Sequence, residues 1–160
     1  MKSLTSCILA LGSNLGNKKQ NLLDAIKLIN ENHVVKKVSQ LYESQSITPD
    51  LQPNYFNCCL SIVTTYQPIP LLKSCKKIER LLGRKSDADL KPRLIDIDII
   101  FYGDKTISMP QLTIPHPRYH ERDFVLKPLN DLLCSSEHPM VKKPIQFLNQ
   151  SCVDIGVIND

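Results

Sequence analysis

The apolar residues of the chain fall into short strand-like runs and two longer segments with helical spacing. β-Branched and other apolar residues cluster or alternate in four runs, which we predict to be strands: residues 7–11, 34–44, 55–66 and 94–102. Between Asn21 and Asn32, and again between Pro68 and Leu82, apolar residues recur at the spacing of one helix face. Proline at the start of the second segment and Gly83 after its end are typical helix boundaries.

Turn-forming residues separate these elements. They mark three connections, at residues 12–17, 45–53 and 84–91. The last of these is polar and mixed in charge, so we expect it to be the most mobile loop. A hairpin through Asp104 and Lys105 is predicted to lead into residues 107–114.

The last part of the chain has a weaker pattern. Residues 118–133 are predicted to form two short helical pieces that are broken at Pro128. From Ser135 onwards no clear periodicity remains, although residues 145–148 are compatible with a last turn of helix.

The order strand, helix, strand, strand, helix, strand predicts an α+β fold with the split βαβ core of ferredoxin-like proteins. We expect an antiparallel or mixed sheet, with helices packed on one face and catalytic loops on the other. The length of 160 residues and the lack of a Gly/Ser-rich linker favour a single domain over residues 1–160.

Composition excludes several classes of protein. With 42% hydrophobic and 22% charged residues, the chain is neither disordered nor fibrous. Its net charge of +4 suits a small anionic substrate but not nucleic acid, and no segment approaches the length of a membrane span. The cysteines contain no Cys-x-x-Cys pair, and we interpret them as apolar core residues in a reducing, cytoplasmic environment: Cys7, Cys58, Cys59, Cys75, Cys134 and Cys152.

Two aspartates on one predicted strand carry the strongest chemical signal. Because strand side chains alternate, Asp96 and Asp98 project together on the side opposite Ile95, Ile97 and Ile99. Neighbouring carboxylates repel unless a cation lies between them, and paired oxygen ligands suit Mg²⁺. Arg93, just ahead, offers a planar donor for phosphate. The alternative is an edge strand with solvated acids; the flanking Pro-Arg and the unbroken isoleucine face favour the metal.

The chain contains neither a P-loop nor a dinucleotide-binding glycine turn, so scattered side chains would have to hold the phosphates. The basic candidates are Arg84, Arg93, His116, Arg118 and Arg122. Alternatively, His116 is a simple turn residue between two prolines. Arg118 and Arg122, one helical turn apart, are equally compatible with a solvated basic face.

An aromatic ring and an amide share a face of a second strand. Tyr55 and Asn57 together can stack on and hydrogen-bond to a flat heterocycle, although an ordinary strand start has the same residue types. Phe124 offers a second aromatic face, or belongs to the core.

Taken together, these motifs resemble the 6-hydroxymethyl-7,8-dihydropterin pyrophosphokinases of folate biosynthesis. The Pro-Arg-x-x-Asp-x-Asp block is the most specific, and the resemblance runs in one order through residues 9–16, 42–44, 52–57, 78–84, 91–98, 112–117 and 122–129. It implies transfer of the diphosphoryl group of ATP to the pterin alcohol, with release of AMP. It also implies ATP as co-substrate, two Mg²⁺ ions as cofactor and the pterin alcohol as the second substrate, with no nucleic acid and no membrane.

The resemblance also implies roles for single residues. Asp96 and Asp98 would bind the metal and act in catalysis together with Arg84 and Arg93. The nucleotide would contact Glu79, Arg84, Arg93, Ile99, Thr113, His116 and Arg122. The pterin would contact Ser44, Tyr55, Asn57, Asp96 and Phe124. Residues 85–91 match a mobile loop that closes over the substrates.

The sequence departs from the family pattern in two places. In the first, Ser44 stands where many members have threonine, and Ser46 and Thr48 lie near positions that are often proline and glycine. In the second, the loop lacks a tryptophan that some members carry, and Leu90 is the residue nearest to that position. Rival interpretations of the acid pair are a nucleotide-sugar glycosyltransferase, a metal-dependent phosphatase, or a non-enzymatic RNA or small-molecule binder. The glycosyltransferase usually needs a longer chain, and aspartates on the sheet face disfavour RNA.

Overall fold

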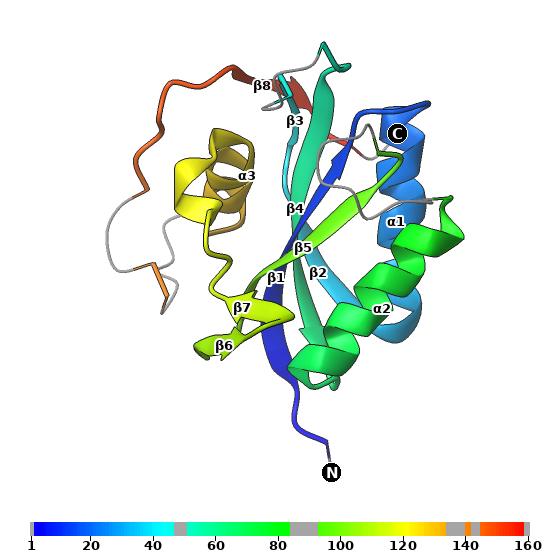
Figure 1. The fold of residues 1–160 in the computed structure, drawn as a ribbon, viewed down its shortest axis with the longest axis vertical. Coiled ribbons are helices and arrows are strands. Elements are labelled where there is room, and N and C mark those ends of the chain that lie inside the picture. Colours follow the sequence, from blue (N-terminus) through cyan, green and yellow to red (C-terminus); the bar gives the residue numbers. More distant parts are fainter. Residues whose placement is uncertain (1, 47–50, 84–92, 134–139, 142–144, 159–160) are drawn as a thin grey trace.

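Most of the chain folds around one antiparallel sheet (Figure 1). The structure, a computed structural model, describes residues 2–46, 51–83, 93–133, 140–141 and 145–158. The sheet contains β1 (Thr5–Ser13), β2 (Val34–Val38), β3 (Leu41–Ser44), β4 (Tyr55–Thr64), β5 (Asp96–Tyr102) and β8 (Cys152–Gly156). A separate hairpin and the helices are β6 (Ile107–Met109), β7 (Leu112–Ile114), α1 (Lys18–Asn32), α2 (Pro68–Leu81), the 3₁₀ turn η1 (Tyr119–Glu121) and α3 (Asp123–Leu133).

The strand order confirms the predicted α+β, ferredoxin-like core. It runs β5-β1-β4-β3-β8, and β2 also pairs with β4. The two central strands, β1 and β4, are antiparallel, and β5 and the β2–β3 segment flank them. This is the pairing that a split βαβ unit requires, because each helix crosses over one intervening strand.

Helices cover both faces of the sheet, which corrects the prediction of helices on one face only. On one face, α1 and α2 bury alternate residues of β1, namely Cys7, Leu9 and Leu11. On the other face lies α3 (Figure 1). It packs against Ile8 and Cys59. The apolar residues of α3 that fill this second core are Val125, Leu129 and Leu132. The face that we expected to carry only loops is therefore partly covered by α3.

The predicted strand over residues 34–44 is interrupted at Ser39 and Gln40. Ser39 exchanges bonds with Cys59: its backbone N–H donates to the Cys59 carbonyl at 3.0 Å, and its Oγ accepts the Cys59 N–H at 2.9 Å. The Gln40 N–H turns away to Asp131 Oδ2 of α3 at 3.1 Å. At Ser39 and Gln40, hydrogen bonds to side chains thus replace part of the regular backbone pairing. As a result, β2 and β3 pair with β4 as two separate strands.

Two later predictions are corrected. The turn at Asp104 and Lys105 does not form a hairpin with β5, because residues 107–114 fold on themselves as the β6–β7 hairpin. The break between η1 and α3 falls at Arg122 and not at Pro128, which lies inside α3. The backbone explains the position of the break: the Arg122 carbonyl accepts the first α3 hydrogen bonds, from the N–H groups of Val125 and Leu126.

Buried carboxyl oxygens hold the C-terminal segment, which the sequence did not reveal. Residues 145–148 do not form a helical turn, and the strand β8 follows them. The Asp123 carboxylate accepts the backbone N–H groups of Leu148 at 2.7 Å and Gln150 at 2.9 Å. Lys127 Nζ donates to the Cys152 carbonyl at 2.7 Å. These hydrogen bonds hold residues 148–152 against α3, and β8 then pairs with β3 at the edge of the sheet.

We predict that Asp123→Ala lowers the free energy of unfolding by about 3 kcal/mol, since the backbone N–H groups of Leu148 and Gln150 would lose the buried carboxylate that accepts both hydrogen bonds. The melting temperature should fall by roughly 6–10 °C, and limited proteolysis should cut first within residues 145–150. The exposed turn residue Asp104 provides the control, because Asp104→Ala should change stability by less than about 0.5 kcal/mol. Equal effects of the two substitutions would contradict the anchoring role of Asp123.

Candidate active site

The two aspartates lie at one end of the sheet, on the face that α3 partly covers. In the β5–β1 ladder Asp96 is opposite Gly12 and Asp98 is opposite Ala10. The intervening residues Ile95, Ile97 and Ile99 point into the core beneath α1 and α2. The predicted alternation of this strand is therefore confirmed.

Burial and mutual repulsion control the protonation of the acid pair. Burial, followed by the charge of Asp96, raises the pKa of Asp98 to about 7, and the nearby Arg122 partly opposes this rise. Arg93 Nη1 forms an ion pair with Asp96 Oδ1 at 3.1 Å. A cation between the carboxylates would relieve the repulsion, so their arrangement fits a metal ion.

The donor set fits Mg²⁺ better than a transition metal. Among residues 2–46, 51–83, 93–133, 140–141 and 145–158, no three His, Cys, Asp or Glu side chains converge as a metal-ligand group. Asp96 and Asp98 thus offer only two hard oxygen groups. Mg²⁺ is commonly held in this way, with water and phosphate oxygens completing its coordination.

The backbone holds His116 beside the acid-bearing strand. The His116 N–H donates to the Ile100 carbonyl at 3.0 Å. Its Nδ1 accepts the Arg118 N–H at 3.1 Å, so the neutral ring carries its proton on Nε2. Burial, then the charge of Arg122, lowers the pKa of His116 to about 4. At neutral pH His116 is therefore a neutral hydrogen-bond donor.

Arg122, which directly precedes α3, is a cation close to the acids. Its charge acts on both Asp96 and Asp98, and its guanidinium lies 5.5 Å from the centre of the Phe124 ring. Within the described part of the chain, its buried Nε has no hydrogen-bond partner. A buried donor of this kind is suited to an anionic ligand. By contrast, Arg118 is exposed and pairs with Glu121 at 3.4 Å, which agrees with a solvated basic face.

Three of the predicted pterin-binding residues, Ser44, Tyr55 and Asn57, lie on β3 and β4, across β1 from Asp96. Asn57 Nδ2 donates to Ser44 Oγ at 2.7 Å, and both side chains are buried. Gly12 lies between Asn57 and Asp96 in the ladder. A Cβ at Gly12 would meet Asn57 Oδ1 at 3.2 Å and the Tyr55 ring at 3.4 Å. The absence of a side chain at Gly12 therefore keeps the surface beside Tyr55 and Asn57 open.

Sequence reasoning assigned Gly12 to a turn, but β1 extends through Ser13. The signal that could have identified it is a glycine inside an apolar strand, which often marks a close approach.

The remaining predicted residues come from separate elements. Glu79 of α2 is 1% exposed and pairs with Lys76 at 3.2 Å, and its charge contributes to the raised pKa of Asp98. Thr113 is exposed on β7, and the Ile99 side chain is part of the core. Phe124 packs against the α3-side core. Arg84 and the predicted loop at residues 84–91 lie outside the described residues.

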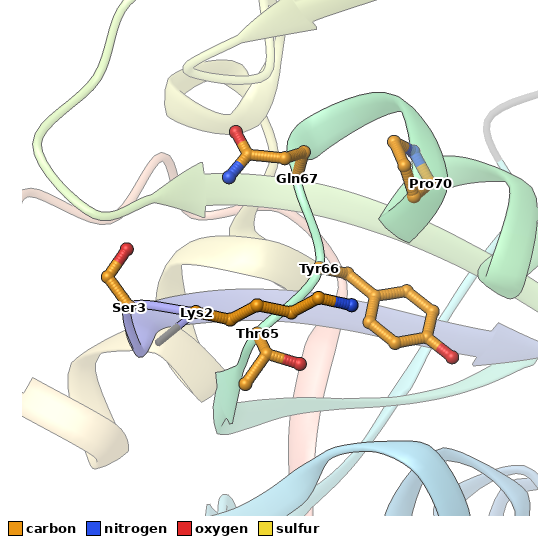
Figure 2. Close-up of a pocket in the computed structure, with 6 residues that line it drawn as sticks. All are labelled: Lys2, Ser3, Thr65, Tyr66, Gln67 and Pro70. Carbon is orange, nitrogen blue, oxygen red and sulfur yellow. The ribbon is translucent and has the colours of Figure 1, made fainter.

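A pocket of about 510 Å³ lies at the opposite end of the sheet, where β1 begins and β4 ends (Figure 2). Its lining residues are Lys2, Ser3, Thr65, Tyr66, Gln67 and Pro70. No predicted site residue lines this pocket. The acid-bearing end of the sheet therefore remains the candidate site.

Comparison with known proteins shows the family to which the chain belongs. Residues 8–134 match the family model of 7,8-dihydro-6-hydroxymethylpterin-pyrophosphokinase. The chain belongs to this family. This pyrophosphokinase-family chain is 36% identical over 143 residues to the 2-amino-4-hydroxy-6-hydroxymethyldihydropteridine pyrophosphokinase of Aquifex aeolicus. The aligned region covers 89% of each protein.

Longer relatives contain the same region. A folic acid synthesis protein of Pneumocystis carinii is 42% identical over 147 residues, which are 91% of this chain but 20% of the relative. A mitochondrial folate synthesis bifunctional protein of Arabidopsis thaliana is 43% identical over 81% of this chain and 24% of its own length. The chain thus spans about a fifth to a quarter of these relatives.

Solved structures agree with the fold. A Plasmodium falciparum HPPK-DHPS structure superposes with a TM-score of 0.65 at 19% identity, over 94% of this chain and 43% of the other.

The structure also bears on the predictions for the cysteines and for membrane spans. The described cysteines, Cys7, Cys58, Cys59, Cys75 and Cys152, are free and buried as expected, whereas Cys134 lies outside the described residues. Within the described part of the family member, no helix has the length and apolarity needed to span a membrane.

We predict that Asp98→Asn stabilises the metal-free protein at high pH. Because the folded pKa of Asp98 is raised from 3.8 to about 7, its contribution to stability is fully present below pH 4 and is lost as pH rises through 7. At pH 8 the variant should therefore be more stable than wild type by about 2–4 kcal/mol. Thermal melts in EDTA from pH 4 to pH 8 would measure this. A gain that does not depend on pH would contradict the assignment.

Proposed function

We propose that this chain transfers the diphosphoryl group of ATP to 6-hydroxymethyl-7,8-dihydropterin. The pterin hydroxyl oxygen attacks the β-phosphorus and loses its proton, and the bond from that phosphorus to the α-phosphate bridging oxygen breaks to release AMP. The single observation that carries the proposal is the position of the acid pair. On one side of Asp96 and Asp98 lie a buried amide and an aromatic ring, and on the other side lies a cluster of hydrogen-bond donors suited to phosphate. The chain also belongs to the pyrophosphokinase family.

Asp96 and Asp98 would hold two Mg²⁺ ions. Bound Mg²⁺ neutralises the triphosphate and orients the reacting oxygens. The raised pKa of Asp98 supports this role. Burial disfavours the charged carboxylate, and a bound metal ion would stabilise that charge.

Basic and neutral donors of the chain would bind the phosphates. Arg122 has a buried Nε that lacks a partner among the described residues, and His116 presents an Nε2–H because Arg118 occupies its Nδ1. Arg93, held beside Asp96, would offset charge on the transferring group, with Arg84 in the same role as predicted from the sequence. Transfer of this kind depends on positioning and charge stabilisation, and needs no side-chain nucleophile.

The pterin would lie over Gly12. Tyr55 and Phe124 provide aromatic surfaces, and Asn57 presents its Oδ1 while its Nδ2 is fixed by Ser44. The serine hydroxyl supplies the acceptor for the Asn57 Nδ2. Glu79, Ile99 and Thr113 remain our proposed contacts for the nucleoside end of ATP.

We extend the proposal to the organisation of the protein. Residues 1–160 would form a single pyrophosphokinase domain whose partners are the two small substrates. The free, buried cysteines support a reducing location such as the cytoplasm.

The test is to incubate the protein with ATP, Mg²⁺ and the pterin alcohol, and to identify the nucleotide product. We predict AMP, formed only when the pterin is present, and a fall of at least about a thousandfold in Asp96→Asn, because a metal ligand is lost. Release of ADP or inorganic phosphate without pterin would reject the proposal in favour of a phosphatase. An unchanged circular dichroism spectrum would show that Asp96→Asn is folded.

We also predict that Asn57→Ala weakens pterin binding by roughly tenfold or more but leaves nucleotide affinity within about twofold of wild type. The polar edge of the heterocycle would lose its buried partner, whereas the phosphates contact other residues. Isothermal titration with each ligand separately measures both affinities. If both ligands bind equally poorly, Asn57 has only a structural role.

A further inference from the structure

Asn14 connects two distant segments of the chain through one side chain. It directly follows β1 and is 1% exposed. Its Oδ1 accepts the Arg93 N–H at 2.7 Å, and its own N–H donates to the Arg93 carbonyl at 3.1 Å. Its Nδ2 donates to Gln52 Oε1 at 3.2 Å and to the Pro53 carbonyl at 3.3 Å. All of the bonding groups of this buried side chain point to residues that are far away in sequence.

These partners lie on opposite sides of the site. Gln52 and Pro53 lie just before β4, which begins at Tyr55 of the proposed pterin surface. Arg93 lies just before β5, which begins at Asp96, and pairs with Asp96 on the side proposed for metal and phosphate. Asn14 thus connects, through hydrogen bonds, the segments that lead into β4 and β5, the two strands that carry proposed substrate-binding residues.

The geometry of an amide makes this contact stiff. Oδ1 and Nδ2 belong to one planar group, so a displacement of Gln52 and Pro53 that rotates the amide also moves the acceptor of the Arg93 N–H. Arg93 is held by two bonds to the same residue, so its backbone follows Asn14. A shift of the Arg93 backbone then changes where its guanidinium lies relative to Asp96.

We propose that Asn14 is a positioning residue that couples pterin binding to the position of Arg93. The inference rests on the proposed function, since it assigns one ligand to each side of Asn14. Coupling of this kind appears as a change in the affinity for one ligand when the other is bound, and it is reciprocal.

Asn21 provides a matched control. Its Nδ2 donates to Ser13 Oγ at 3.2 Å and to the Leu15 carbonyl at 2.8 Å, so it braces the residues on both sides of Asn14. Neither bond reaches Gln52 or Arg93. Asn21→Ala therefore loosens the same turn without cutting the connection.

The experiment measures the affinity for the pterin alcohol with and without a non-hydrolysable ATP analogue and Mg²⁺. In wild type we expect the two affinities to differ by roughly tenfold or more. In Asn14→Ala the ratio should fall to within about twofold of one. Gln52→Ala, which removes only one acceptor, should give an intermediate ratio, and Asn21→Ala should keep the wild-type ratio. Thermal melts identify any variant that fails to fold.

Three results would overturn the inference: a ratio of one in wild type, a wild-type ratio in Asn14→Ala, or an equal loss in Asn21→Ala. If Asn14→Ala does not fold, a wild-type ratio in folded Gln52→Ala also overturns it. Absence of pterin-dependent AMP release by the wild-type protein rejects the proposed function and the inference with it. Normal AMP release with uncoupled ligands in wild type rejects the inference alone.

Discussion

The repulsion between Asp96 and Asp98 is the constraint on which the rest of the site depends. Their spacing cannot relax, because each residue is fixed opposite β1 in the ladder, at Gly12 and Ala10. Nor can the strand slip by one residue, since that would turn the buried isoleucines out and the acids into the core. Burial of Asp98, together with the charge of Asp96, therefore raises the pKa of Asp98 to about 7. This arrangement favours a cation beside the two carboxylates.

The surroundings of the pair compensate only in part. Arg93 contacts Asp96 directly, and Arg122 acts on both carboxylates from the start of α3. His116 adds no positive charge at neutral pH, because burial and the neighbouring arginines keep its ring neutral. Among the described residues, the site thus combines Arg93 and Arg122 with one neutral donor, His116. This balance leaves the acids available for metal while the arginines can still bind an anion.

The sequence predicted those features that depend on local periodicity. Alternation along one strand placed Asp96 and Asp98 on one face, and the element order predicted the pairing of the core strands. By contrast, the break after β2 and the path of the chain into β8 involve backbone N–H groups that donate to the carboxylates of Asp131 and Asp123, which lie far away in sequence. Asn14 was hidden for the same reason: its residue type fits a tight turn, and its partners are 38 to 79 residues away. Tertiary hydrogen bonds leave no periodic trace.

Those same bonds determine where Arg122 lies. Asp123 binds the tail at the start of α3, and Asp131 near its end accepts bonds from the Gln40 N–H and, at 2.8 Å, from the Tyr42 hydroxyl. With both ends anchored, α3 cannot swing away from the sheet without leaving buried groups unpaired. Arg122 is therefore held near the acids whether or not they carry a proton. If metal takes over the charge of the acid pair, the arginine loses its counter-charge and becomes a stronger site for phosphate oxygens. Metal binding at the acids would thus strengthen phosphate binding at the start of α3.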